Sequence, residues 1–248
     1  GRRDPHRGAH VPHHRPGDGH ARQGEGETCG VAVETAVDTV MIIDPHTYAE
    51  GFIQEDEVKK SARARGEEIG AIDTTCGTGA YLKHLAHILS AQSVVEIGTG
   101  SGIGALWVLE GMLASGTLTS IDDEMEHSNA AKLAFQSADI AAARFRLITN
   151  PVMDVMTKLA DRAYDLVIFR HNPEDLPVAI NEAHRILRSG GVFVIDNFFG
   201  GEKVSDPAQR DPKTVALREA GKSMKNETDL WVTSLIPVGD GLLLATKL

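Results

Sequence analysis

Residues 94–105 form a turn that can bring the backbone close to a ligand. The run VVEIGTGSGIGA places Glu96 at the end of an apolar stretch, and glycines follow at positions 98, 100, 102 and 104. Glycine has no side chain and tolerates positive φ angles, so a cofactor can lie against the main chain where a strand leads into a helix. We therefore expect a cofactor site at the carboxyl end of this strand.

Acidic side chains near this turn indicate which cofactor it binds. Residues 100–105 fit the dinucleotide pattern GxGxxA, and Asp122 follows at the spacing of a ribose-binding acid, so a nicotinamide dehydrogenase is one alternative. A carboxylate at Glu96 would repel a pyrophosphate, whereas it can organise the amino-acid end of S-adenosylmethionine. Asp122, with Asp123 beside it, would then accept hydrogen bonds from the ribose hydroxyls, unless both merely form an acidic surface turn. The charges favour the sulfonium cofactor.

Short apolar runs, separated by stretches with helical spacing, supply the framework for these residues. Five runs are strand-like: SVVEIG, TLTSID, RFRLIT, YDLVIF and GVFVID. Repeated β–α units predict a parallel sheet, and runs that are apolar on both faces predict helices on both sides. WVTSLIP and LLLATKL, joined by VGDG, predict an antiparallel hairpin at the sheet edge. The expected fold class is α/β, with a doubly wound, mostly parallel sheet of seven strands and a Rossmann-like architecture.

The N-terminal part of the chain differs in composition from this α/β region. Residues 1–30 are rich in Gly, Arg, His and Pro and have almost no large apolar side chains, so we expect a disordered tail without assigned function. Residues 31–70 contain one or two polar helices that would cover the domain as a lid or a dimer element. Residues 71–248 form the cofactor-binding domain. Its first helical stripe consists of Leu82, Leu85, Ala86 and Leu89.

Charge, cysteine content and hydropathy limit the classes of partner. The formal net charge is −10, so the body of the chain repels phosphate backbones and nucleic acid is not expected. Cys29 and Cys76 form no CxxC pair, as expected in a reducing compartment. No apolar run has the length of a membrane helix, and no signal peptide is evident. We expect a cytoplasmic homodimer that binds a small-molecule acceptor and no membrane.

Together these motifs resemble those of the catechol-type O-methyltransferases, family 3 of the class I S-adenosylmethionine-dependent enzymes, and especially their bacterial branch. The similarity extends over roughly residues 45–248 and is carried by VVEIGTGSG, SIDDEMEH, YDLVIF, HRILRSGGVFVIDN and PVGDGLLLATK. The resemblance implies cofactor contacts at Thr74, Glu96, Gly98, Thr99, Gly104, Asp122 and Asn172. Gly104 stands where the family usually has serine, so one hydroxyl contact to the cofactor's carboxylate is lost.

The run after the fourth strand departs from this family. Where the family has Asp, any residue, Asp and Lys, this chain has Arg170, His171, Asn172 and Pro173. The resemblance implies that relatives bind a divalent ion through the first aspartate and the pair matching Asp196 and Asn197, with the lysine as base. A guanidinium inverts the local charge and would compete with a cation for Asp196. We therefore expect no tight magnesium site, with Asp196 and Asn197 as the only candidate ligands.

The same replacements decide the candidate catalytic residues. Pro173 cannot accept a proton, so His171 is the nearest candidate base, although its ring could instead pack against adenine or cap the next helix. Arg170 is predicted to contact the substrate. Asp196 and Asn197 are predicted catalytic residues, although they could simply end the fifth strand and bond the loop backbone.

Two functions from different classes therefore stand beside the dehydrogenase. The leading hypothesis is methyl transfer from S-adenosylmethionine to an oxygen of a small, phenolic acceptor, achieved mainly by positioning. The loop at 198–211 contains two phenylalanines that would suit a planar acceptor or a dimer contact. The alternative is a cofactor-binding homologue that has lost catalytic activity, because Arg170 and Pro173 replace residues on which the family's chemistry depends.

Overall fold

The computed structural model describes residues 43–248, so the predicted tail at residues 1–30 lies outside the described residues. The helices are α1 Pro45–Glu50, α2 Glu57–Glu68, α3 Cys76–Ile88, α4 Ile103–Gly111, α5 Met125–Ser137, α6 Val152–Met156, α7 Leu176–Ile186 and α8 Pro212–Asn226. The strands are β1 Ser93–Ile97, β2 Thr117–Asp122, β3 Phe145–Thr149, β4 Tyr164–Phe169, β5 Leu187–Ile195, β6 Trp231–Ile236 and β7 Leu242–Lys247. Short 3-10 turns are η1 Ala142–Arg144, η2 Pro173–Asp175 and η3 Lys203–Ser205.

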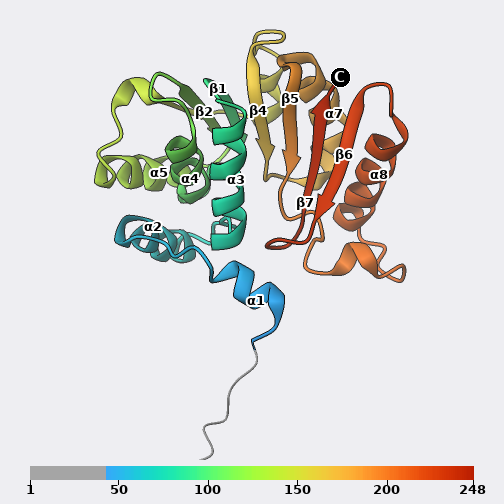
Figure 1. The fold of residues 1–248 in the computed structure, drawn as a ribbon, viewed down its shortest axis with the longest axis horizontal. Coiled ribbons are helices and arrows are strands. Elements are labelled where there is room, and N and C mark those ends of the chain that lie inside the picture. The colour runs from blue at the N-terminus through green and yellow to red at the C-terminus, as the bar shows by residue number, and fades with distance from the viewer. Residues whose placement is uncertain (1–42) are drawn as a thin grey trace, which may run out of the picture. The chain divides into compact units, whose positions relative to one another are not determined.

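The strands form a seven-stranded sheet in the order β3-β2-β1-β4-β5-β7-β6 (Figure 1). Strands β1 to β5 pair in parallel, while β7 is antiparallel to both β5 and β6. The predicted fold class is therefore confirmed, including the antiparallel C-terminal hairpin. One detail differs, because the reversed strand β7 lies between β5 and β6 and leaves β6 as the sheet edge.

Helices cover both faces of the sheet, as the continuous apolar runs predict. On one face, Val94 and Leu166 pack with side chains of α3, α4 and α5. On the other face, the neighbouring residues Val95 and Val167 pack with α6, α7 and α8. Successive strand residues point to opposite faces, so each strand contributes to both cores. None of the described helices is long and apolar enough to cross a membrane.

The first two helices are tied to the domain by polar contacts. Asp44 caps α1 by accepting hydrogen bonds from the N–H groups of His46 and Thr47. At the other end of α1, the Glu50 carboxylate accepts hydrogen bonds from the N–H groups of Gly77 and Gly239. Helix α2 packs against α4 and α5. Both helices thus fall in the segment for which a covering role is predicted, and that role stays a prediction.

The sheet register brings the predicted site residues to one edge. Ile97 pairs with Ile121 of β2 and with Phe169 of β4, and Phe169 pairs with Ile195 of β5. The residues that follow these positions therefore leave the sheet at the same level. Strand order also changes direction between β1 and β4, and such a switch point opens a crevice at the carboxyl ends of the strands.

Helices α3 and α4 lie close enough together that only glycine fits at two contact points. A Cβ added to Gly79 would lie 2.3 Å from the Trp107 ring, and one added to Gly111 would lie 2.0 Å from the Lys83 carbonyl oxygen. Thr74 directly precedes α3, and the glycine turn leads into α4. This contact therefore fixes two parts of the crevice relative to each other.

We predict that Gly111→Ala lowers the free energy of unfolding by about 1–3 kcal/mol, because its methyl group would press on the backbone of α3. Chemical denaturation measures this change. Gly51→Ala is the matched control, since the nearest atom to its added Cβ would be 3.5 Å away. Equal stability of the two variants would show that the α3–α4 contact tolerates a side chain.

Candidate functional site

A cavity of about 710 Å³ opens at the carboxyl edge of the sheet. It extends across the ends of β2, β1, β4 and β5, and the segment after β5 completes its wall. The lining includes the predicted residues Gly98, Asp122, Asp123, Arg170, His171, Asn172, Asp196 and Asn197. The structure thus brings most of the predicted site residues together, although they come from four strands.

The glycine turn packs closely against the end of β4. Gly98 has a φ of 89°, and a Cβ there would lie 1.9 Å from the Arg170 carbonyl oxygen. Gly102 also has a φ of 89°, and its Cβ would lie 2.8 Å from the Cα of Ala131. Both positions require glycine for conformation and for space. The turn is therefore held between β4 and α5.

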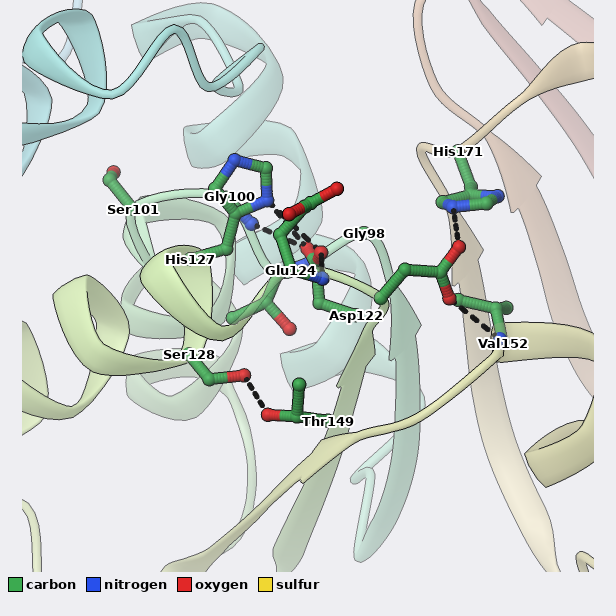
Figure 2. A network of polar contacts seen from close by, with 12 residues as sticks. Gly98, Gly100, Ser101, Asp122, Glu124, His127, Ser128, Thr149, Val152 and His171 are labelled. Atoms are coloured by element: carbon green, nitrogen blue, oxygen red, sulfur yellow. Dashed lines mark hydrogen bonds and ion pairs between the residues drawn. The ribbon is translucent and has the colours of Figure 1, made fainter.

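The carboxylate of Asp122 organises this turn from β2. Its Oδ2 accepts hydrogen bonds from the N–H groups of Thr99, at 2.7 Å, and Gly100, at 3.3 Å. Its Oδ1 accepts one from the N–H of Glu124 at 2.9 Å, and the His127 Nδ1 lies 3.0 Å from the same oxygen. Figure 2 shows His127 pointing toward Asp122. The predicted residues Asp122 and Thr99 are thus directly joined.

His127 lines the cavity but was missed by the sequence analysis. It lies five residues after Asp122, in the first turns of α5. The sequence signal that could have identified it is a histidine at the start of the helix that follows an acidic strand end. Because its ring contacts Asp122, the predicted ribose-binding residue, His127 belongs to the same part of the site.

His171 lies between two carboxylates. Its Nε2 is 3.3 Å from Asp123 Oδ2, and its Nδ1 is 3.3 Å from Asp175 Oδ2. Asp123 is itself fixed, because its Oδ1 accepts a hydrogen bond from the Val152 N–H at 2.8 Å. Both ring nitrogens thus face acidic oxygens. The role of His171 as a base stays a prediction.

A buried guanidinium occupies the centre of the site. Arg170, 8% exposed, donates from Nε to Asp196 Oδ2 at 2.8 Å and from Nη1 to the Gly98 carbonyl at 3.3 Å. Its Nη2 donates to Thr74 Oγ1 at 3.2 Å and lies 3.5 Å from Glu96 Oε1. Burial acts to lower the pKa of Arg170, but the charges of Asp196 and Glu96 outweigh it and raise the pKa. Arg170 therefore carries a fixed positive charge.

Glu96 is fully buried behind this guanidinium and does not line the cavity. Ser120 donates a hydrogen bond to its Oε2 at 2.7 Å, whereas its Oε1 has no hydrogen-bond partner. Burial raises the pKa of Glu96 to about 7, although Arg170 and Ser120 act in the opposite direction. The carboxyl group therefore changes charge near neutral pH.

Gly104 faces this buried pair from the first turn of α4. A Cβ at this position would lie 2.5 Å from Arg170 Nη2 and 2.5 Å from Glu96 Oε1. Any larger residue would displace one of the two groups. Gly104 thus provides the space in which the guanidinium and the carboxyl group meet.

Asp196 and Asn197 directly follow β5, at the opposite side of Arg170. The Thr74 hydroxyl donates to Asp196 Oδ2 at 2.8 Å, and the Asn197 N–H donates to Asp196 Oδ1 at 2.8 Å. Asn197 has a φ of 55°, a left-handed conformation that asparagine tolerates better than most residues. This backbone geometry places Asn197 on the cavity wall. Thr74 contacts Asp196 and Arg170 rather than bordering the cavity.

Metal-ligand side chains are sparse around Asp196. In residues 43–248, no group of three or more His, Cys, Asp or Glu side chains is arranged to hold a metal ion. The Oδ2 of Asp196 instead accepts from both Arg170 and Thr74. A cation at this carboxylate would have to compete with the guanidinium.

Phe198 and Phe199, predicted to suit either a planar acceptor or a dimer contact, do not line the cavity. Phe198 is 5% exposed, and its ring fills the space beside Gly221, where a Cβ would lie 2.6 Å from Cζ. The Phe199 ring packs similarly against Gly241. Neither borders the cavity, because the apolar rings are used to anchor the loop to α8 and to the β6–β7 turn.

Comparison with known proteins gives consistent matches over this region. The family model described as O-methyltransferase matches residues 46–248. A Mycobacterium ulcerans protein named "Putative O-methyltransferase" is 43% identical over 200 residues, which are 81% of this chain and 89% of that protein. A solved Corynebacterium glutamicum protein shares the fold with a TM-score of 0.75 and 30% identity, covering 81% of this chain and 94% of its own.

A further solved structure shares the fold at lower identity. It is the O-methyltransferase TomG from Streptomyces achromogenes, described as involved in tomaymycin synthesis and in complex with SAM. Its TM-score is 0.72 and its identity 23%, with 81% of this chain and 94% of TomG covered. At this identity the likeness concerns the fold alone.

We predict that Glu96→Gln removes a pH-dependent loss of stability. Because burial raises the pKa of this carboxyl group from 4.5 to about 7, the contribution of Glu96 to wild-type stability is fully present below pH 4.5 and is lost as the pH rises through about 7. The unfolding free energy of the variant relative to wild type should therefore increase by at least about 1 kcal/mol between these values. Urea denaturation across this range measures it, with the exposed Glu57→Gln as control. A difference that is constant with pH would contradict this assignment.

Proposed function

The chain belongs to the O-methyltransferase family, and on this basis we propose that it moves a methyl group from S-adenosylmethionine to an oxygen of a small, phenolic acceptor without a divalent ion. The family resemblance seen in the motifs is thereby confirmed. The observation that carries the proposal of metal independence is the 2.8 Å ion pair between Arg170 and Asp196 at the cavity wall.

The residues of the cavity fit the sulfonium cofactor. Gly98 and Gly100 of the glycine turn line the cavity, and the buried Oδ1 of Asn172 has no hydrogen-bond partner. An adenine amino group could supply that missing donor. S-adenosylmethionine provides a methyl group activated by a positive sulfur, and the fold neighbour TomG is described as holding it. Asp122, Asp123 and Glu124 also line the cavity, and their charges disfavour the pyrophosphate of a dinucleotide.

Arg170 supplies the positive charge that a metal ion would otherwise contribute. The guanidinium is fixed by Asp196, Thr74 and the Gly98 carbonyl. The guanidinium is part of the chain, so its positive charge is present without any ion being bound from solution. Its proximity also lowers the attraction of Asp196 for a second cation. These contacts support a methyltransferase that does not depend on magnesium.

The acceptor hydroxyl would lie near the end of β5, where Asp196 accepts a hydrogen bond and Asn197 can donate one. As the acceptor oxygen bonds to the methyl carbon, the carbon–sulfur bond breaks and the hydroxyl proton passes to water. Positioning of the two reactants then provides most of the acceleration, and effective molarities can correspond to about 7–11 kcal/mol.

The absence of a base at position 173 favours one alternative function. Pro173 has no side-chain group that can take a proton, and the nearest histidine is held by Asp123 and Asp175. A chain with these features could bind the cofactor and an acceptor without transferring the methyl group. Turnover distinguishes this cofactor-binding homologue from the enzyme.

We predict transfer of a labelled methyl group from S-adenosylmethionine to at least one member of a panel of catechols and hydroxybenzoates, at a rate that a chelator changes by less than about two-fold. A metal-dependent reaction would require the ion at Asp196, which is already paired with Arg170. Scintillation counting of the extracted product measures the rate. The control is the same assay with added magnesium.

The outcomes separate the parts of this proposal. Transfer that stops with chelator and returns with magnesium would refute metal independence while preserving methyl transfer. Binding of S-adenosylhomocysteine without turnover on the panel would favour the homologue that has lost catalysis. Absence of any cofactor binding would refute the proposed function itself.

A further inference from the structure

We propose that Arg170 receives the carboxylate of the cofactor's amino-acid end and that Gly104 provides the space this requires. The inference rests on the proposed binding of S-adenosylmethionine. It differs from the prediction that Arg170 contacts the acceptor. It also differs from the prediction that Glu96 contacts the cofactor directly. Four observations support it, concerning position, free donors, charge and space.

The guanidinium lies where the amino-acid end would extend from the ribose. Asp122, the predicted ribose acid, ends β2, and the glycine turn beside it ends β1. Arg170 directly follows β4, the next strand, and its Nη1 donates to the carbonyl of Gly98 in that turn. Both Gly98 and Arg170 line the cavity. A cofactor with its ribose at Asp122 and its amino-acid end along the turn would therefore reach Arg170.

The glycine turn itself has few donors left for a carboxylate. The N–H of Gly98 donates to Ile121, those of Thr99 and Gly100 donate to Asp122, that of Ser101 donates to Asp73, and that of Gly102 donates to Thr99. All five N–H groups are thus committed within the protein. A carboxylate buried here still needs charged or polar donors, since leaving it unpaired is costly.

Arg170 can supply such donors. A guanidinium has five N–H groups, and its hydrogen-bond acceptors here are Asp196, the Gly98 carbonyl and Thr74. The remaining contact, with Glu96, is longer at 3.5 Å. The two Nη atoms therefore keep capacity for a bound carboxylate. The other cavity-lining cations, Lys203 and Lys213, belong to the segment after β5 and lie on the acceptor side.

Glu96 acts as the counter-ion of this arginine. It is fully buried and absent from the cavity lining, so the guanidinium stands between it and the cofactor. When Glu96 is ionised, its negative charge behind Arg170 keeps the arginine in place and compensates part of its desolvation. Glu96 thus serves the cofactor through Arg170 rather than by touching it.

Gly104 makes this arrangement sterically possible. A Cβ there would come within 2.5 Å of Nη2 and 3.3 Å of Nη1, so even alanine would push the end of the guanidinium away from the turn. Residues 104 and 170 are therefore coupled. A side chain at 104 and an arginine at 170 compete for one volume.

The test compares S-adenosylmethionine with its decarboxylated analogue, which keeps the adenosine, sulfonium and amine. Isothermal titration gives the ratio of their dissociation constants. For wild type we expect the analogue to bind about 10- to 100-fold more weakly, the range of a charge-assisted hydrogen bond. In Arg170→Met the ratio should fall to within about three-fold of one, and Arg170→Lys should restore part of it. Gly104→Ala should also lower the ratio although it leaves the charge in place.

The matched control is Lys213→Met, which removes another cavity-lining cation and should leave the ratio unchanged. A wild-type ratio near one, or a ratio that survives in Arg170→Met, would overturn the assignment. Equal weakening of both ligands in that variant would also overturn it, because it would indicate a purely structural role. If Arg170→Met does not fold, Gly104→Ala and Arg170→Lys decide by the same ratio. Failure of wild type to bind either ligand would instead refute the proposed function.

Discussion

Burying a guanidinium costs desolvation free energy, and the site of this protein is arranged to offset that cost around Arg170. Asp196 supplies a close ion pair, Glu96 a second negative charge, and Thr74 and the Gly98 carbonyl complete the contacts. These groups come from β5, β1, the segment before α3 and the glycine turn. Breaking such a buried set typically costs about 3–5 kcal/mol. The geometry of the cavity therefore depends on one side chain that joins four parts of the chain.

The sheet makes this convergence possible. Parallel strands in register deliver Gly98, Asp122, Arg170 and Asp196 to one edge, and the switch point between β1 and β4 leaves that edge open. The close glycine contact between helices α3 and α4 then fixes the positions of the segments that flank the crevice. The function is thus a consequence of topology plus a small number of side chains, and the same topology can carry other chemistry when those side chains change.

Much of this arrangement could be predicted from the sequence, because strands and helices have periodic signals. The seven strands follow from short apolar runs, and the glycine turn and Asp122 follow from local spacing. The partners of His171 could not be predicted, since Asp123 reaches it from a different strand. The packing of Phe198 could not be predicted, because sequence does not show whether a loop aromatic is needed to fill space beside a glycine such as Gly221. Local signals identify residues, whereas pairings between distant segments require the fold.

The changes at positions 104, 170 and 173 are best understood together. Arg170 needs the space at Gly104, and it occupies the oxygen of Asp196 that a cation would use. Under the proposed metal-free transfer, no ion would hold the acceptor's hydroxyl, so a base beside such an ion would have less to act on and Pro173 would remove little that the site could use. An acceptor must then be chosen by shape and by its own acidity, because a more acidic hydroxyl needs less help in losing its proton. The proposed site therefore favours acceptors whose hydroxyl is acidified by the ring that carries it, which is the chemical property that separates phenols from aliphatic alcohols.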